Sequence, residues 1–137
     1  PSGKNLKSWE LIVVDDEETI QKLAASRGPA SRPLANAPLA IVVAANPELT
    51  DVWIEDASII TTIIQLMAQS LGLGSCWIQA RERFTQEDER VSDYVKKILD
   101  IPENYEVEAM VAIGYPDEEK AAHKVDLNSD KIHYNKF

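Results

Sequence analysis

The stretch VWIEDASIITTIIQLMAQSLGLG, residues 52–74, decides the fold. Its apolar side chains recur at helical spacing, which predicts a long helix that ends at Gly72 or Gly74. The main apolar stripe consists of Ala57, Ile60, Ile64, Met67, Ala68 and Leu71. Ile59 and Ile63 widen this stripe beyond what one buried face needs. We therefore expect a central helix that is buried on several sides or packs against another subunit.

Short apolar runs on both sides of this helix predict strands, and two further segments show amphipathic periodicity. The expected strands cover 11–14, 39–45, 75–79 and 105–116. The expected flanking helices cover 15–27, with Asp15 and Glu18 as a capping pair, and 84–101, with Thr85 and Asp88 as a second pair. The stretch 28–38 contains three prolines and is expected to be a loop. Alternating strands and helices predict an α/β or α+β layered domain.

Composition narrows the class of protein. A chain of 137 residues with 45% hydrophobic and 27% charged residues fits one soluble globular domain over 1–137, followed from 117 by a polar tail. The formal net charge of −9 repels nucleic acid and anionic membranes, so neither is an expected partner. No apolar run is long enough and free enough of polar residues to span a membrane. A cytoplasmic location is the default expectation.

Neither metal binding nor hydrolysis is supported by the motifs. Cys76 is the single cysteine, which excludes an internal disulfide framework, and the two histidines lack zinc-site spacing. We interpret Cys76 as a small hydrophobe in a buried strand. The chain lacks a G-x-S-x-G elbow, an HExxH motif and a P-loop. Hydrolytic chemistry and a metal site are therefore not expected.

Each of two turns can be interpreted either as a purely structural feature or as part of a binding site. LGLGSCW, residues 71–77, is a helix stop before a strand, or a place where Gly74 and Ser75 leave room for a planar ligand. PSGKN, residues 1–5, is a simple polar turn, or a set of hydroxyl and amide groups that can both donate to and accept from the edge of a heteroaromatic ring. On local grounds the structural interpretation is favoured for both.

Four segments in order resemble the nitroreductase family of FMN-dependent oxidoreductases. PSGKNLKSWELIVV resembles the family's Pro-Ser-x-x-Asn-x-x-Trp turn and first strand, although Ser8 stands before the tryptophan where glutamine followed by proline or tryptophan is common. NAPLAIVVAAN resembles the second strand. WIEDASIITTIIQLMAQSLGLGSCWI resembles the central helix and following turn, and VEAMVAIGYPDE resembles the last core strand with its Gly-Tyr-Pro ending. The match covers nearly the whole chain.

The resemblance implies an α+β sandwich around a mostly antiparallel sheet of four to five strands, flanked by helices, with a long buried central helix. It implies a homodimer with FMN in two interface clefts. It further implies that hydride passes from NAD(P)H to the flavin, and then to a nitroaromatic, a quinone or a similar small-molecule acceptor, in ping-pong order. The acceptor itself and the choice between NADH and NADPH are not encoded in any motif.

The resemblance also assigns cofactor contacts. Pro1, Ser2, Gly3 and Asn5 match the turn that contacts the flavin, often from the partner subunit. Gly74 and Ser75 match the turn whose backbone approaches the reactive ring nitrogen. The family usually holds the FMN phosphate with a basic residue after Gly-Tyr-Pro. Lys124 ranks first for this role, followed by Lys120 and His123.

One family feature is missing in front of Pro1. The family normally begins with a helix that carries an Arg-Arg-Ser-x-Arg type motif and grips the phosphate. Either the domain is N-terminally incomplete and continues upstream, or the protein lacks this helix. The second case favours a dimeric binding or interaction protein with a nitroreductase-like fold and no redox activity. A specialised flavin enzyme, such as a dehalogenase, is a further alternative.

Overall fold

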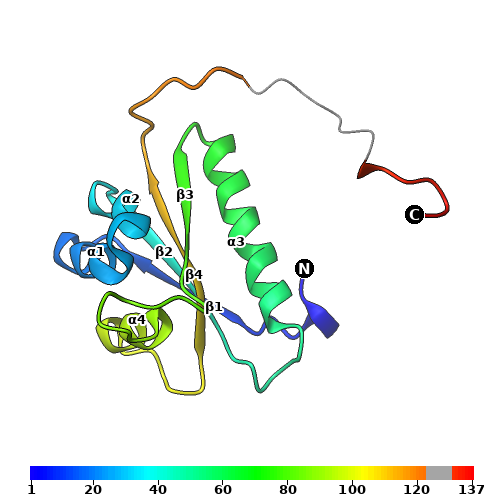
Figure 1. Ribbon diagram of the computed structural model, residues 1–137, viewed down its shortest axis with the longest axis horizontal. Helices are drawn as coiled ribbons and strands as arrows, with labels where there is room; N and C mark the ends of the chain where they lie inside the picture. Colours follow the sequence, from blue (N-terminus) through cyan, green and yellow to red (C-terminus); the bar gives the residue numbers. More distant parts are fainter. Residues whose placement is uncertain (123–130) are drawn as a thin grey trace.

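The computed structural model describes residues 1–122 and 131–137, and its elements alternate between strands and helices (Figure 1). The strands are β1 (Trp9–Val14), β2 (Leu39–Ala45), β3 (Gly74–Gln79) and β4 (Glu106–Gly114). The α-helices are α1 (Glu17–Ala24), α2 (Arg32–Ala35), α3 (Trp53–Ser70) and α4 (Val91–Leu99). Two 3₁₀ segments, η1 (Gly3–Asn5) and η2 (Ala25–Ser31), complete the described elements.

The four strands form one antiparallel sheet in the order β1-β2-β4-β3. This confirms the predicted α+β class and the mostly antiparallel sheet of four strands. β2 and β4 are central: β2 is wholly apolar, and β4 is apolar apart from Glu106 and Glu108, as expected for strands that are covered on both faces. β3 lies at an edge and pairs only with β4, with Gly74 opposite Gly114 and Gln79 opposite Ala109.

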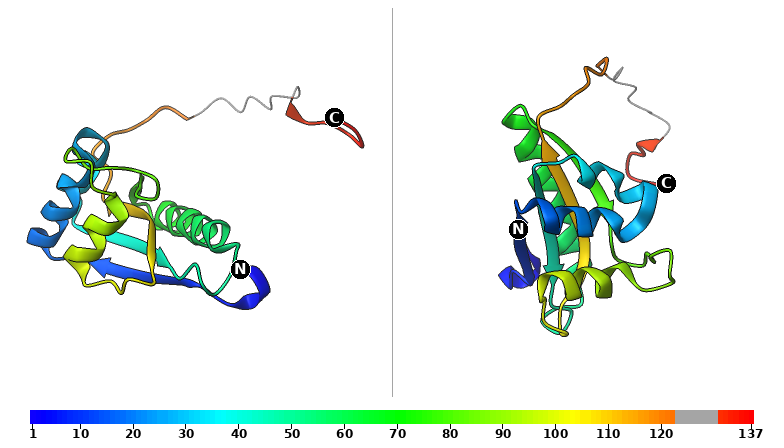
Figure 2. Two further views of the ribbon diagram at one scale, coloured as in Figure 1. Left: turned by 60° about the horizontal axis from the view of Figure 1, so that its bottom comes forward. Right: turned by 90° about the vertical axis from the view of Figure 1, so that its left-hand side faces the viewer.

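Helices cover the two faces of the sheet unequally (Figure 2, right). Side chains of α1, α2 and α4 pack on one face in the larger core cluster, which contains Ile20, Leu34, Val95 and Met110. On the opposite face α3 is the only helix of the described residues that covers the sheet, through residues such as Ala57 and Ala68. In this part of the chain, one face of the sheet is well covered and the other depends on a single helix.

The burial of α3 differs from the expectation. Only Asp56, Ala57, Thr61 and Ala68 of this helix are buried, so the chain does not enclose the helix on several sides. Met67 and Leu71, which were expected in its buried stripe, are 58% and 67% exposed. Within a single chain, the helix has one covered face and one apolar outer face. Of the two expectations for α3, only contact with another subunit remains.

The first flanking helix has its N-cap one residue later than expected, and as an α-helix it ends at Ala24 rather than Arg27. Asp16, rather than Asp15, is the N-cap of α1, because its carboxylate accepts a hydrogen bond of 2.8 Å from the amide of Thr19. The stretch 28–38 is also not simply a loop, because it contains the end of η2 and the whole of α2. Pro33 stands in the first turn of α2, where a missing N–H costs the helix nothing.

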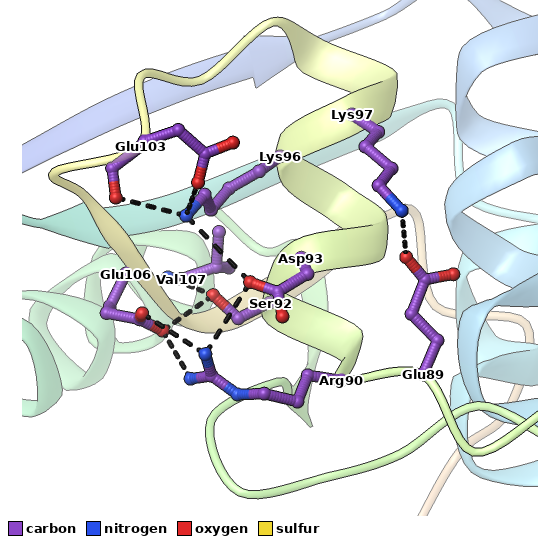
Figure 3. A network of polar contacts seen from close by, with 9 residues as sticks. All are labelled: Glu89, Arg90, Ser92, Asp93, Lys96, Lys97, Glu103, Glu106 and Val107. Atoms are coloured by element: carbon purple, nitrogen blue, oxygen red, sulfur yellow. Dashed lines mark hydrogen bonds and ion pairs between the residues drawn. The ribbon is translucent and has the colours of Figure 1, made fainter.

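The second flanking helix is shorter than expected, because α4 starts at Val91 and the preceding residues form a turn. The Thr85 hydroxyl accepts hydrogen bonds from the amides of Glu87 and Glu89, so Thr85 caps this turn instead of a helix. The helix is tied to β4 by a polar network (Figure 3). Within it, Ser92 accepts from the Val107 amide at 2.9 Å and contacts the Glu106 carboxylate at 2.9 Å.

Among the residues that the structure describes, every helix falls short of the length and apolar character needed to span a bilayer.

Candidate functional site

The opening turn has an unusual backbone. Lys4, Asn5 and Lys7 all have positive φ angles, of 51°, 57° and 50°. Non-glycine residues rarely adopt this left-handed region, and a cluster of them persists only when surrounding contacts enforce it. Hydrogen bonds within the turn help to hold this backbone conformation. The Ser2 hydroxyl accepts from the Lys7 amide at 3.0 Å, and the Ser2 carbonyl accepts from the Asn5 amide at 3.0 Å.

Contacts with the start of α3 also hold the opening turn in this conformation. The Gly3 amide donates to the Asp56 carboxylate at 2.8 Å, and Asp56 is only 3% exposed. A Cβ atom on Gly3 would lie 2.5 Å from Cγ2 of Val52, so only glycine fits this approach. Asp56 lies in the first turn of the helix, where the helix dipole favours a negative charge. Figures 1 and 2 show the turn beside this end of α3.

Asp56 also has an oxygen without a protein partner. Its Oδ2 atom is buried and makes no hydrogen bond to any described residue. The sequence analysis gave Asp56 no role. Glu55 and Asp56 are both acids of the first turn of α3 and only Asp56 is buried, so the sequence alone does not separate the anchor from its exposed neighbour. The chain thus fixes the predicted cofactor turn rigidly in place.

Gly74 and Ser75 lie at the other end of α3. Gly72, with a φ of 72°, is the glycine that ends the helix, and Leu73 donates back to the Ala68 carbonyl at 2.9 Å. Gly74 is therefore not needed as a helix stop. A Cβ atom there would meet the Gly114 carbonyl at 3.5 Å and Pro116 at 3.6 Å, which are ordinary contact distances. The fold does not require glycine at 74, which favours the ligand interpretation of this turn.

An open cleft of about 330 Å³ surrounds this second turn. Gly74, Ser75 and Cys76 line it from β3, and Tyr115 and Pro116 line it from the Gly-Tyr-Pro ending of β4. Tyr115 is 88% exposed. The sequence prediction assigned no role to this tyrosine, although the Gly-Tyr-Pro motif was the signal for it. Cys76 is exposed and not buried as expected, because β3 is an edge strand.

Of the three predicted phosphate ligands, only Lys120 lies in the described part of the chain, and it does not line this cleft. Lys120 is exposed and its ammonium pairs with the Glu118 carboxylate at 2.7 Å. This hydrogen bond to Glu118 raises the pKa of Lys120 above its usual value. His123 and Lys124 lie outside the described residues. Among the described residues that line the cleft none is basic, while Asp117 and Glu118 bring carboxylates to it.

The two predicted cofactor turns are far apart in one chain. Gly3 lies at the N-terminal end of α3 and Gly74 follows its C-terminal end. A helix of 18 residues is about 27 Å long at 1.5 Å per residue. The structure therefore brings together the residues within each turn, but it does not bring the two turns together.

Between these two ends α3 presents an apolar outer surface. Its exposed apolar side chains are Ile59, Ile63, Leu66, Met67 and Leu71. A groove of about 330 Å³ beside the helix continues this surface towards Leu39 and Ile41 of β2, and its exposed lining is wholly apolar. Contiguous apolar surface of this kind marks a contact with another molecule.

Comparison with known proteins places the chain among nitroreductases. The model of the Nitroreductase family matches residues 25–115. A protein of Archaeoglobus fulgidus, whose name combines NADH dehydrogenase and NAD(P)H nitroreductase, is 38% identical over 100% of this chain and 79% of its own length. A protein of Methanothermobacter thermautotrophicus with the same name is 31% identical over 100% of this chain and 70% of its length. The solved FMN-dependent nitroreductase of Clostridium difficile R20291 is 49% identical, with a TM-score of 0.96 over 100% of this chain and 80% of that one.

Proposed function

This chain belongs to the nitroreductase family, and from that premise we propose that it is an FMN-dependent NAD(P)H oxidoreductase. The proposed acceptor is a nitroaromatic, a quinone or a similar small molecule, reduced in ping-pong order. When bound, FMN would supply the redox chemistry, which is hydride transfer from the nicotinamide to the acceptor. The support is the 49% identity to a protein described as FMN-dependent and the 38% identity to one named for NAD(P)H and nitroreduction.

The observation that carries the proposal is the position of the two turns at opposite ends of a helix whose outer face is apolar and exposed. If two copies pack through the outer face of α3 about a two-fold axis perpendicular to the helix, their helices run antiparallel. The Gly3 end of one copy then lies near the Gly74 end of the other. Two equivalent sites result, each made from the opening turn of one protomer and the cleft of its partner. We propose a homodimer of this kind.

The residues of each half-site fit a flavin. Ser2 and Asn5 carry a hydroxyl and an amide, which suit the mixed donors and acceptors at the edge of a flavin ring. The contact of Gly3 with Asp56 holds these groups in place before the cofactor binds, which lowers the ordering cost of binding. Gly74 and Ser75 present little side chain towards the cleft and so leave room for a planar ring.

We also propose which residues bind the phosphate group of FMN. Lys124 remains the first choice, with Lys120 and His123 after it. Lys120 would have to exchange its contact with Glu118 for the phosphate. Because both side chains are exposed, this exchange costs little free energy.

The experiment is a spectroscopic titration of the purified protein. We expect a flavin absorbance spectrum after purification or after addition of FMN, with one FMN bound per protomer. Under anaerobic conditions NADH or NADPH should bleach that spectrum, and a quinone or nitroaromatic should restore it. Light scattering should report a dimer. A protein that stays colourless with excess FMN, or whose bound FMN is not bleached by either nucleotide, would contradict the proposal.

A second candidate function is a dimeric binding or interaction protein without redox activity. The observation in its favour is the cleft around Gly74, where Asp117 and Glu118 oppose a phosphate and no described lining residue is basic. This candidate predicts a dimer that consumes neither NADH nor NADPH with any quinone or nitro compound, even with FMN present. Measured nucleotide consumption separates the two functions.

A further inference from the structure

The cleft around Gly74 continues into a second hollow. This hollow has a volume of about 400 Å³ and is lined by residues of α1 and of the segment before β2. The linings of the cleft and of the second hollow share Asn36 and Ala37, so the two form one trough. A molecule that enters the cleft is therefore also close to the groups that line the second hollow.

The charged groups that line this trough in the described part of the chain are all acidic. The cleft contributes Asp117 and Glu118, and the second hollow contributes Asp15 and Glu17. None of the described lining residues is a lysine, an arginine or a histidine. Because these carboxylates add to a net charge of −9 for the whole chain, the trough attracts cations and repels anions.

Lys120 offsets part of this charge. Its ammonium pairs with the Glu118 carboxylate at 2.7 Å. The carboxylates of Asp15, Glu17 and Asp117 take part in none of the ion pairs between described residues. The trough therefore keeps a net negative charge after this pairing.

Tyr115 gives the trough an aromatic surface. It lines the cleft and is 88% exposed, so its ring is open to a ligand. The face of an aromatic ring attracts a cation and offers a planar molecule a surface to stack on. Carboxylates alone would suit any cation, and an aromatic ring alone would suit any planar molecule. The two together favour a planar organic cation.

We propose that this trough binds planar aromatic cations through Tyr115 and Asp117, and that such cations are the preferred electron acceptors of the protein. The inference rests on the proposed function, because it names the substrate class of the same cleft. Methylene blue, a phenothiazinium dye, has this chemistry. One hydride, which is a proton with two electrons, converts the cation to a neutral product, while NADH is oxidised to NAD⁺. Because the product has lost its charge, the trough holds it less tightly than the substrate.

The first test is calorimetric titration of the full chain, with and without added FMN. The probes are methylene blue and anthraquinone-2-sulfonate, which is planar and anionic. At low ionic strength we expect the cation to bind at least about tenfold more tightly than the anion. Most of this difference should disappear at about 0.5 M salt, where the charges are screened. Equal binding of the two probes at low ionic strength would overturn the proposal.

Substitutions locate the site. Tyr115→Leu removes the aromatic face and Asp117→Asn removes one carboxylate, so each should raise the Kd of methylene blue about threefold or more. Tyr115→Phe keeps the aromatic face and should bind as the unchanged protein does. The matched control is Glu87→Gln, which removes another exposed negative charge, from the turn before α4. The proposal fails if this control weakens binding as much as Asp117→Asn does, or if Tyr115→Leu has no effect.

The second test is the salt dependence of turnover by the FMN-loaded protein with NADH. In ping-pong order, kcat/KM for an acceptor depends only on the half-reaction of that acceptor. It should fall about tenfold for methylene blue as salt is added, and stay constant for duroquinone, which is neutral. If duroquinone is reduced but kcat/KM for methylene blue does not change with salt, this inference fails and the proposed function stands. If neither acceptor is reduced, the proposed function and the preferred acceptor both fail.

Discussion

Replacing Gly3 with alanine tests whether the opening turn is held by α3. The backbone of Gly3 does not lie in the left-handed region, so alanine has no intrinsic strain there. The added methyl group would lie 2.5 Å from Cγ2 of Val52, well inside van der Waals contact. Val52 is β-branched and its side chain is stiff. Either the turn or the side chain of Val52 must therefore move.

The cost can be bounded in two ways. If the turn stays docked, overpacking of this size costs about 1–3 kcal/mol. If the turn detaches, the hydrogen bond from the Gly3 amide to Asp56 is lost, and bonds to charged groups contribute about 1.5–3 kcal/mol. Both routes predict a loss of about 1–3 kcal/mol. If docking of the turn is required for FMN binding, the Kd for FMN should rise about tenfold or more.

The assay combines urea unfolding with FMN titration by fluorescence quenching. The matched variants are Val52→Ala alone and Gly3→Ala combined with Val52→Ala. Removal of Cγ2 eliminates the clash, so the double variant should recover most of the stability and affinity lost in Gly3→Ala. Because Val52 is only partly buried, the single Val52→Ala change should cost less than about 1 kcal/mol.

Two results would refute this reasoning. If Gly3→Ala is as stable and binds FMN as tightly as the unchanged protein, the turn is not docked as described. If the double variant is no better than Gly3→Ala, the cost is not steric. A loss of stability without any loss of FMN affinity would separate the turn from the cofactor site.

Three further predictions concern α4, the outer face of α3 and the cap of α1. Ser92→Ala should lower the free energy of unfolding by about 1–3 kcal/mol, because it leaves a buried amide of β4 without an acceptor; an unchanged urea midpoint would contradict this. Met67→Glu should convert the proposed dimer to monomers in light scattering, whereas Phe84→Glu, at a similarly exposed apolar residue on a loop, should leave it dimeric. A hydrogen bond from Thr19 holds the pKa of Asp16 below its ordinary value of 3.8. The ionised Asp16 cap therefore stabilises the folded protein above pH 3.8. This stabilisation is lost as the pH falls through the pKa of Asp16 in the folded state. Thermal unfolding should therefore show an advantage over Asp16→Asn at neutral pH that shrinks in acid, and an advantage independent of pH would count against the cap.

The strands and α3 could be predicted because each is a long apolar run with polar residues at its ends. The prolines of the 28–38 segment were misleading, because a proline excludes helix only where an N–H is needed and Pro33 occupies a first turn. The cap of α1 could not be located within the pair Asp15 and Asp16, since both have the same side chain. Cys76 was placed inside because a strand sequence does not reveal whether the strand is central or at an edge.

The candidate site was predictable as two separate turns but not as an arrangement. Gly3 and Gly74 were both singled out from the sequence, yet nothing in their spacing shows that they flank the two ends of one helix. The role of Asp56 as the anchor of the opening turn depends on a contact across 53 residues of sequence, which no local pattern records. The apolar outer face of α3 was visible in the sequence as an excess of isoleucine, and the structure shows that this excess points away from the sheet.

Complementation between two variants tests most directly whether each flavin site is shared by two protomers. Gly3→Val should disable the opening turn, and Gly74→Val should obstruct the cleft, so each homodimer should bind little FMN. When the two are unfolded together and refolded, a shared site predicts that mixed dimers contain one intact site. About one quarter of the wild-type FMN should then return, because half of the dimers are mixed. If the mixture binds no more FMN than its components, each site belongs to a single chain and the account is wrong.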